Sequence, residues 1–361
     1  MEQGRISDGQ VAYLLYVTVI ATSILIMPSI AGQQAGRDFW LSAIIAAVFG
    51  FWGIFIALSL NKLYPGLHPF EMFEQLLGSY LGKLLGIVYL FFFLHANALF
   101  IRQYAEFVIT VFLPKTPVPA IIGLMAAVCA LAVRGGIEVL ARTAQLFLPI
   151  SLIVWFGLLL ITIPDWEFQN ILPILEFGAL PSLKGGFLLQ TWYGEFIMLA
   201  FLIPFLSSGK HIKKYSLWAL VGVIITFVLI SFSSLLIFGI ETTNFIYPFF
   251  EVIRYINVGS FFENIDALPL AFWILTIYLK ISVFHYAMVY GTAHLLKLSD
   301  YRSLSLPLSL LLAATGLWIV PNTQKLIDFF SSVSPTYFTC FNTLLPSIVL
   351  LAAWIQRKVK G

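Results

Sequence analysis

Four charged side chains lie inside long apolar runs, where an unpaired charge costs several kcal/mol, on the order of 3. They are Arg102, Glu106, Glu195 and Lys280. Arg102 and Glu106 are one helical turn apart and can form an ion pair, which is either structural or acts as a gate or ligand clamp. Lys280 has no acid one turn away, so it must find a carboxylate, carbonyls or water from another helix, and candidate partners are Glu195, Glu106 and the carboxylate of a ligand. We predict that these four residues act as coupling or gating charges.

Residues that interrupt helices lie in two of the apolar runs, the first and the sixth. In the first apolar run, Pro28 cannot donate to the helix ladder and Gly32 follows one turn later. In the sixth run, Gly194 adjoins Glu195, which suits either a proton-carrying carboxylate or one that caps a broken half-helix. A single Pro or Gly also produces simple kinks, whereas paired breaks free backbone groups that coordinate a small zwitterion or ion. The matched positions favour helix breaks at Pro28, Gly32 and Gly194 that form a binding site.

The composition is that of a membrane protein. The chain has 361 residues, 60% hydrophobic and 10% charged, with a mean hydropathy of +0.95, whereas soluble domains have roughly 25% charged residues. These values exclude a soluble enzyme and a disordered chain, and a net charge of +3 without a basic cluster excludes a nucleic-acid binder. Solid apolar runs exclude a β-barrel. Cys129 and Cys340 lie in apolar runs, and without metal or catalytic motifs we expect no metal, no cofactor and no enzyme.

These residues must be positioned by an all-α bundle of ten transmembrane helices. A span needs about 20 mostly apolar residues, and the long third and eighth runs should tilt. Residues 68–78 predict a short amphipathic helix at the interface, and the aromatic loop 241–267 predicts a helix on the outer face. The ten predicted spans are residues 10–35, 39–62, 83–113, 117–134, 141–163, 183–207, 215–238, 266–296, 303–320 and 334–356.

Lys and Arg residues are unequally divided between the two sides of these spans. Cytoplasmic loops carry the excess of positive charge, so the richer side predicts cytoplasmic N and C termini. The thirteen residues of that side are Arg5, Lys62, Lys83, Arg134, Arg142, Lys210, Lys213, Lys214, Lys297, Arg302, Arg357, Lys358 and Lys360. The five of the other side are Arg37, Lys115, Lys184, Arg254 and Lys325.

The order and spacing of several short pieces resemble one family over nearly the whole chain. The chain is similar to the B subunit of bacterial spore germinant receptors, the endospore germination permease family of the amino acid–polyamine–organocation transporter superfamily. The chain departs from the family pattern at Asn264, where many relatives have an Arg. The salt bridge with the outer loop that the resemblance implies at this position therefore lacks its cation. The pieces are residues 6–10 (ISDGQ), 25–28 (LIMP), 102–106 (RQYAE), 193–195 (YGE) and 263–268 (ENIDAL), followed by Trp273 and Lys280.

The resemblance implies a five-plus-five inverted repeat, the LeuT-like fold, with broken helices 1 and 6. By this reading one repeat covers about 10–163 and the other about 183–356. It implies a small germinant such as an amino acid, A-type and C-type partner subunits, and the spore inner membrane. Laid on that fold, the ligand site lies between spans one, three, six and eight. Its expected lining is Ala21, Thr22, Ser23, Ile24, Phe92, Ala96, Trp192, Tyr193, Gly194, Lys280 and Phe284.

Three functions need such a cavity, and the residues alone leave all three open. The first is a receptor subunit in which ligand binding shifts a conformational equilibrium. The second is a proton-coupled amino acid permease, with Glu195 or Lys280 exchanging protons. The third is a component of a ligand-gated ion channel. The family resemblance places the receptor first.

Overall fold

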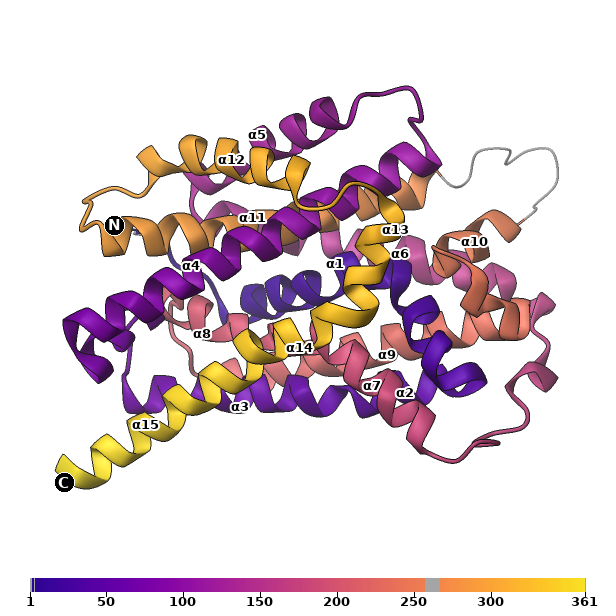
Figure 1. The fold of residues 1–361 in the computed structure, drawn as a ribbon, viewed down its shortest axis with the longest axis horizontal. Helices are drawn as coiled ribbons and strands as arrows, with labels where there is room; N and C mark the ends of the chain where they lie inside the picture. Colours follow the sequence, from indigo (N-terminus) through magenta and orange to yellow (C-terminus); the bar gives the residue numbers. More distant parts are fainter. Residues whose placement is uncertain (1, 3, 257–266, 361) are drawn as a thin grey trace.

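The fold is a bundle of helices, seen in a computed structural model that describes residues 2, 4–256 and 267–360 (Figure 1). Long apolar segments become helices because no water is available inside a membrane to hydrogen-bond a free backbone. In the described residues there is no strand, although Ile6 and Leu206 form one isolated parallel bridge. The α-helices are α1 (Asp8–Ala35), α2 (Phe39–Ile45), α3 (Ala47–Leu63), α4 (Pro69–Val111), α5 (Val118–Gly135), α6 (Ile137–Thr162), α7 (Leu180–Tyr193), α8 (Leu199–Leu202), α9 (Ile212–Phe238), α10 (Pro248–Tyr255), α11 (Ala267–Leu295), α12 (Arg302–Trp318), α13 (Thr323–Asp328), α14 (Ser334–Thr339) and α15 (Leu345–Lys360).

Short segments of other helix types join some of these helices. Where such a segment lies within a span, the backbone leaves the α-helical hydrogen-bond pattern, which often marks a functional position. The 3₁₀-helices are η1 (Gly36–Asp38), η2 (Ile163–Asp165), η3 (Phe168–Ile171), η4 (Gly194–Met198), η5 (Ile203–Phe205) and η6 (Gly239–Asn244), and the π-helices are η8 (Phe329–Val333) and η9 (Cys340–Leu344).

Eight described helical segments are long and apolar enough to cross a membrane. One of them, Asp8–Leu63, turns at η1 and contains the first two predicted spans, and α12, with 17 residues, corresponds to the ninth. The chain is therefore a multi-pass membrane protein whose helices account for the ten predicted spans. The tenth span begins earlier than predicted, because the helical segment already starts at Thr323 and runs through two π-helices.

The structure has a helix at each of the two places predicted outside the spans. α4 has one non-helical residue, Gly78 (φ 81°, ψ 169°), so its first part is a separate short helix before the third span. This conformation is accessible to glycine because it has no Cβ. α10 lies within the predicted outer loop. Residues Glu263 and Asn264 of that loop lie outside the described residues.

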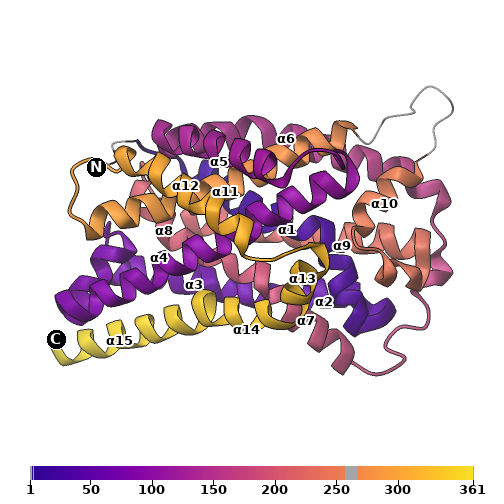
Figure 2. The same cartoon turned by 45° about the horizontal axis from the view of Figure 1, so that its top comes forward.

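α1 lies at the centre of the bundle. It contacts α6, α7, α9 and α11, and every residue from Leu14 to Ala31 is buried. A helix enclosed on every side needs apolar residues all round rather than on one face, which the sequence of α1 provides. Figures 1 and 2 show that the N and C termini lie at the same end of the bundle, as an even number of spans requires.

The two predicted interruptions differ in the structure. Pro28 and Gly32 both lie inside α1, which remains one α-helix from Asp8 to Ala35, so the break predicted for the first span is not seen. A Pro at position 28 removes only the hydrogen bond to the carbonyl four residues earlier, and the enclosing helices hold the rest of the turn. In the sixth span, the backbone changes from α7 to the 3₁₀-helix η4 at Gly194, the position at which the sequence predicts an interruption.

Candidate functional site

The centre of the candidate site is a buried ion pair between two spans. The Nζ atom of Lys280, in the middle of α11, lies 2.8 Å from both carboxylate oxygens of Glu195 in η4. Nζ also donates to the hydroxyl of Thr22 on α1 over 2.7 Å. All three side chains are 0% exposed. Among the partners proposed for Lys280 from the sequence, Glu195 is the one that contacts it in the structure.

Every N–H donor of the Lys280 ammonium has an acceptor. An ammonium has three N–H donors, and Glu195 and Thr22 supply three acceptor oxygens. The ring of Phe100 lies 4.0 Å from Nζ and that of Phe284 lies 5.9 Å away, measured to the ring centres. An aromatic face attracts a cation by its quadrupole, and the attraction is stronger where water is excluded. A buried charge pair is tolerated because every donor has a partner.

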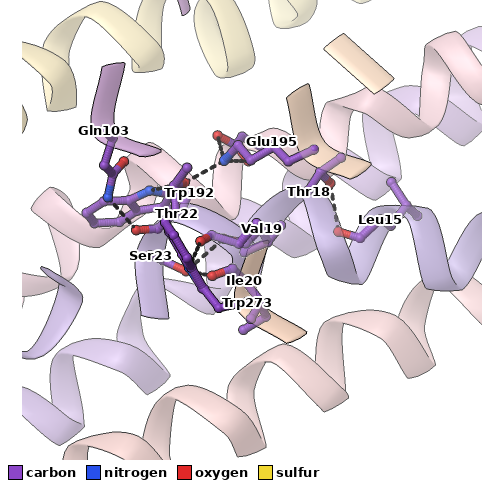
Figure 3. Close-up of polar contacts among 12 residues, drawn as sticks. Leu15, Thr18, Val19, Ile20, Thr22, Ser23, Gln103, Trp192, Glu195 and Trp273 are labelled. Carbon is purple, nitrogen blue, oxygen red and sulfur yellow. Dashed lines mark hydrogen bonds and ion pairs between the residues drawn. The ribbon is translucent and has the colours of Figure 1, made fainter. Parts of the chain in front are cut away.

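Backbone carbonyls of α1 on the same turn accept side-chain hydrogen bonds from neighbouring helices. Trp273 Nε1 donates to the Ala21 carbonyl over 2.8 Å, and Gln103 Nε2 donates to the Thr22 carbonyl over 2.9 Å. Trp192 Nε1 donates to the Thr22 hydroxyl over 3.0 Å. Figure 3 shows the contacts of Gln103 and Trp192 converging on Thr22, with Glu195 nearby. Side chains of α4, α7, η4 and α11 thus meet at one turn of α1.

The change of helix type in the sixth span is packed against the tenth span. At Gly194 an added Cβ would lie 3.0 Å from Cβ of Asn342 in η9, so the two backbones approach closely. One turn before, Thr191 and Ser334 share a hydrogen bond of 3.2 Å, and Gln190 Nε2 donates to the Pro335 carbonyl. A 3₁₀ segment in one span therefore faces a span that contains π-helices. Such departures from regular helix geometry adjust which backbone groups are free.

Arg102 and Glu106 form the second predicted charge pair, away from Lys280. Their side chains are 2.7 Å apart, and Arg102 also donates to the carbonyls of Leu317 and Pro321 over 3.2 and 3.0 Å. Thr323 donates to Glu106 over 2.5 Å. These bonds fasten α4 to the end of α12 and the start of α13. Of the two roles left open by the sequence, this geometry favours a structural one.

Some predicted lining residues turn away from the ion pair. The Ser23 hydroxyl donates back to the Val19 carbonyl of its own helix over 2.7 Å. The Tyr193 hydroxyl donates to the Ala43 carbonyl of α2 over 2.8 Å, and its ring contacts Phe227 of α9. Both side chains serve packing between helices rather than the neighbourhood of Lys280.

The other predicted lining residues are buried at varying positions around the pair. Phe92 stacks on Phe341 in η9 with ring centres 4.5 Å apart, so it borders the tenth span. Ile24 and Ala96 are 0% exposed on α1 and α4.

In the part of the chain that the structure describes, no group of three or more His, Cys, Asp or Glu side chains is placed to hold a metal ion.

Three residues at the ion pair were not among the predicted lining. Phe100 and Gln103 follow Ala96 by four and seven residues, so helical periodicity places all three on one face of α4. Trp273 precedes Lys280 by seven residues and shares its face of α11 in the same way. The signal was therefore present in the spacing. Gln103 is 1% exposed, and its Oε1 atom has no hydrogen-bond partner among the described residues.

The fold resembles that of a solved transporter. Mhp1, a nucleobase-cation-symport-1 family transporter in a closed conformation with bromovinylhydantoin bound, matches with a TM-score of 0.65 and 12% sequence identity. The match covers 98% of this chain and 79% of that transporter. At this identity the likeness concerns the fold alone. The chain is an all-α membrane protein of the LeuT-like transporter fold.

Sequence comparison identifies the family within that fold. A family model described as "Spore germination protein" matches residues 5–324, and the chain belongs to this family. Spore germination protein KB of Bacillus subtilis (strain 168) is 29% identical, with 99% of this chain and 97% of that protein covered. Spore germination protein XB of Bacillus anthracis is 24% identical, with 96% and 97% covered. Neither the family nor these relatives are described as enzymes.

Proposed function

We propose that this protein is the membrane-embedded B subunit of a spore germinant receptor and binds a small nutrient, an amino acid or a similar molecule. The observation that carries the proposal is the buried contact of Lys280 with Glu195 and Thr22 at the change of helix type in the sixth span. Buried ionisable residues are rare in membrane spans and usually serve ligands or ions. The LeuT-like fold and the germination family support the same reading.

A zwitterionic ligand can replace the Lys280–Glu195 ion pair with two new ones, its carboxylate on Lys280 and its ammonium on Glu195. All three donors of Lys280 are already occupied, so a ligand carboxylate has to replace one of the present acceptors, and we propose that it replaces an oxygen of Glu195. The displaced Glu195 carboxylate then accepts hydrogen bonds from the ligand's ammonium group. The unpartnered Oε1 atom of Gln103 offers a second acceptor. Each charge keeps a partner throughout, which is necessary where water is excluded.

Ligand binding of this kind also changes what holds η4 in place. Glu195 belongs to η4, which packs against α3 and η9, so loosening the Glu195–Lys280 pair alters the sixth span relative to α1 and α11. A ligand shifts a two-state equilibrium only by its difference in affinity for the two states, and a few kcal/mol suffice. We infer that A-type and C-type subunits in the spore inner membrane bind this chain and respond to the change in its conformational equilibrium. In this arrangement both termini of the chain face the cytoplasm.

A proton-coupled amino acid permease is the second candidate, and the same pair favours it. A carboxylate and an ammonium 2.8 Å apart and fully buried can exchange one proton directly, which is how ionisable residues couple transport to proton movement. The likeness to a transporter fold agrees with this alternative. In it, the pair alternates between two faces of the membrane instead of signalling to partner subunits.

Two experiments separate these functions. Deletion of the gene, followed by germination assays with single amino acids, should abolish or weaken the response to at least one of them. If every nutrient response survives the deletion, the receptor proposal is wrong. Purified chain reconstituted into vesicles with labelled amino acids tests the permease, which should concentrate its substrate when a pH gradient is applied.

A further inference from the structure

Two surface grooves flank the end of α3, at the end of the bundle where the C-terminus lies (Figure 1). The groove between α3 and α15 is lined by Lys62, Arg357 and Lys358. The groove between α3 and α9 is lined by Lys62 and Lys213. Lys62 therefore belongs to both, and the grooves together present four cations around the end of one helix.

The protein does not neutralise these four cations itself. Among the described residues, no Asp or Glu lines either groove. In the same part of the chain, the ion pairs involve other residues, and none of the four cations takes part in one. A concave surface lined by charges of one sign concentrates the opposite charge. The grooves therefore suit an anion.

Apolar side chains continue both grooves along the membrane-spanning helices. Phe55 precedes Lys62 by seven residues and Leu351 precedes Lys358 by seven, so each pair shares a helix face, with the apolar residue about 10 Å deeper along the axis. Phe55 and Leu351 are 44% and 55% exposed. Trp354 stands between these depths with its ring 6.4 Å from that of Phe55, and tryptophan prefers the headgroup level of a bilayer.

We propose that these grooves are a binding site for an anionic phospholipid. Its phosphate is held by Lys62 together with Arg357 and Lys358, and its acyl chains lie along Phe55 and Leu351. A soluble anion or an acidic protein segment matches the cations but not the apolar walls two helical turns deeper. Basic pockets between membrane helices are a recognised means of binding anionic headgroups. The site shares no residue with the proposed nutrient site.

The position of the grooves links the lipid to the sixth span. On the other side of α3, an added Cβ at Gly53 would lie 3.0 Å from the backbone nitrogen of Ile197 in η4, and one at Gly50 would lie 3.3 Å from the Tyr193 ring. α3 thus stands directly between the grooves and the change of helix type at Gly194. A lipid seated on α3 supports the helix against which η4 packs, so its removal should also lower the stability of the chain.

Titration of the full-length purified chain with POPG and with POPC, followed by native mass spectrometry, tests the proposal. The wild-type chain should retain POPG in preference to POPC. The variant K62Q/K358Q should bind POPG roughly 25-fold more weakly, because each cation near the headgroups contributes about fivefold. The matched control K115Q/K184Q removes two exposed lysines from the other side of the spans and should bind POPG as the wild type does.

Several outcomes would overturn the site. They are equal retention of POPG and POPC, an equal loss in both double variants, or undiminished POPG binding by K62Q/K358Q. Preferential binding of an acidic peptide over POPG would assign the grooves to a protein partner instead. Melting temperature is the second readout: POPG should raise that of the wild type and of the control, and should not raise that of K62Q/K358Q. Equal stabilisation of all three proteins contradicts the proposal.

Discussion

Lys280 and Glu195 are 85 residues apart in the chain, yet the Nζ atom of Lys280 lies 2.8 Å from both oxygens of the Glu195 carboxylate. The two residues come from the eighth and the sixth spans, and Thr22 of the first span completes the contact. The buried ion pair thus joins two spans of the second predicted repeat, and the hydrogen bond to Thr22 ties it to the first repeat, at the point where the sixth span changes helix type. Disruption of this pair should affect both stability and ligand response.

The first prediction concerns loss of one partner of this pair. Lys280→Met leaves the Glu195 carboxylate buried without compensation, which should cost about 3–5 kcal/mol of stability. The double variant K280M/E195Q removes both charges and should recover much of that loss. Melting temperatures of the purified proteins measure the effect. The control is Lys325→Met, which breaks an exposed pair with Asp328 and should change little. A double variant no more stable than K280M would contradict this account.

Germination assays on the same pair separate stability from function. If a nutrient inserts between Lys280 and Glu195, the double variant should fold and yet lose its response to the nutrient. Protein levels in spores must be compared by immunoblot. A normal dose response at normal protein level would show that the pair is structural only.

The second prediction concerns the hydroxyl of Thr22, which accepts hydrogen bonds from both Trp192 and Lys280. Thr22→Val keeps the shape and removes the acceptor, leaving two buried donors short of a partner at a cost of about 1–3 kcal/mol. Thr22→Ser retains the hydroxyl and should stay close to the wild type. Thermal melting of both variants gives the comparison, and equal stability of the Val and Ser variants would count against the hydrogen-bond network.

Much of the fold could be predicted from the sequence, because the bilayer imposes simple rules on it. The length of an apolar run sets a span, and buried charges must find partners, so Lys280 had to meet an acid or a ligand. The choice of Glu195 among the possible partners needed the distances between helices. No pattern within one span encodes how two spans approach each other.

The prediction for α1 failed for a related reason. Pro28 and Gly32 weaken a helix locally, but whether the helix breaks depends on its neighbours. Here α1 is enclosed on all sides and stays helical through Pro28 and Gly32. Local sequence indicated a weak point in α1, while tertiary packing determined the conformation.

The third prediction concerns Gln103, whose Oε1 atom is buried without a partner among the described residues. If this atom accepts a hydrogen bond from the nutrient, Gln103→Leu should raise the nutrient concentration needed for half-maximal germination by about tenfold, the value for one lost hydrogen bond to a charged group. Gln145→Leu on α6 is the matched control. An unshifted dose response with Gln103→Leu would remove Gln103 from the ligand site.

The fourth prediction concerns Arg102 and Glu106. Because they fasten α4 to the end of α12 and the start of α13, Glu106→Gln should lower the melting temperature of the chain. The nutrient dose response per folded protein should stay unchanged, since neither side chain contacts Lys280. A shifted dose response at equal protein level would instead assign the pair to gating.

The fifth prediction concerns pH and the N-terminal Glu2. Burial alone would raise the pKa of the Glu2 carboxyl, but hydrogen bonds from the Tyr301 hydroxyl, the backbone N–H groups of Gly4 and Ile137, and the Tyr286 hydroxyl outweigh it and lower that pKa. A carboxyl with a lowered pKa in the folded state stabilises the protein above its unfolded pKa, about 4.3. That stabilisation is lost as the pH falls through the folded pKa.

Glu2→Gln should therefore melt at a lower temperature than the wild type at pH 7, and the difference should shrink as the pH falls below about 4. The physical reason is that only the ionised carboxylate accepts hydrogen bonds from both hydroxyls and both N–H groups while carrying charge toward the N-terminus of α6, at Ile137. Melting curves from pH 7 to pH 3 measure the change. A constant difference over this range would show that Glu2 acts through packing and not through its charge.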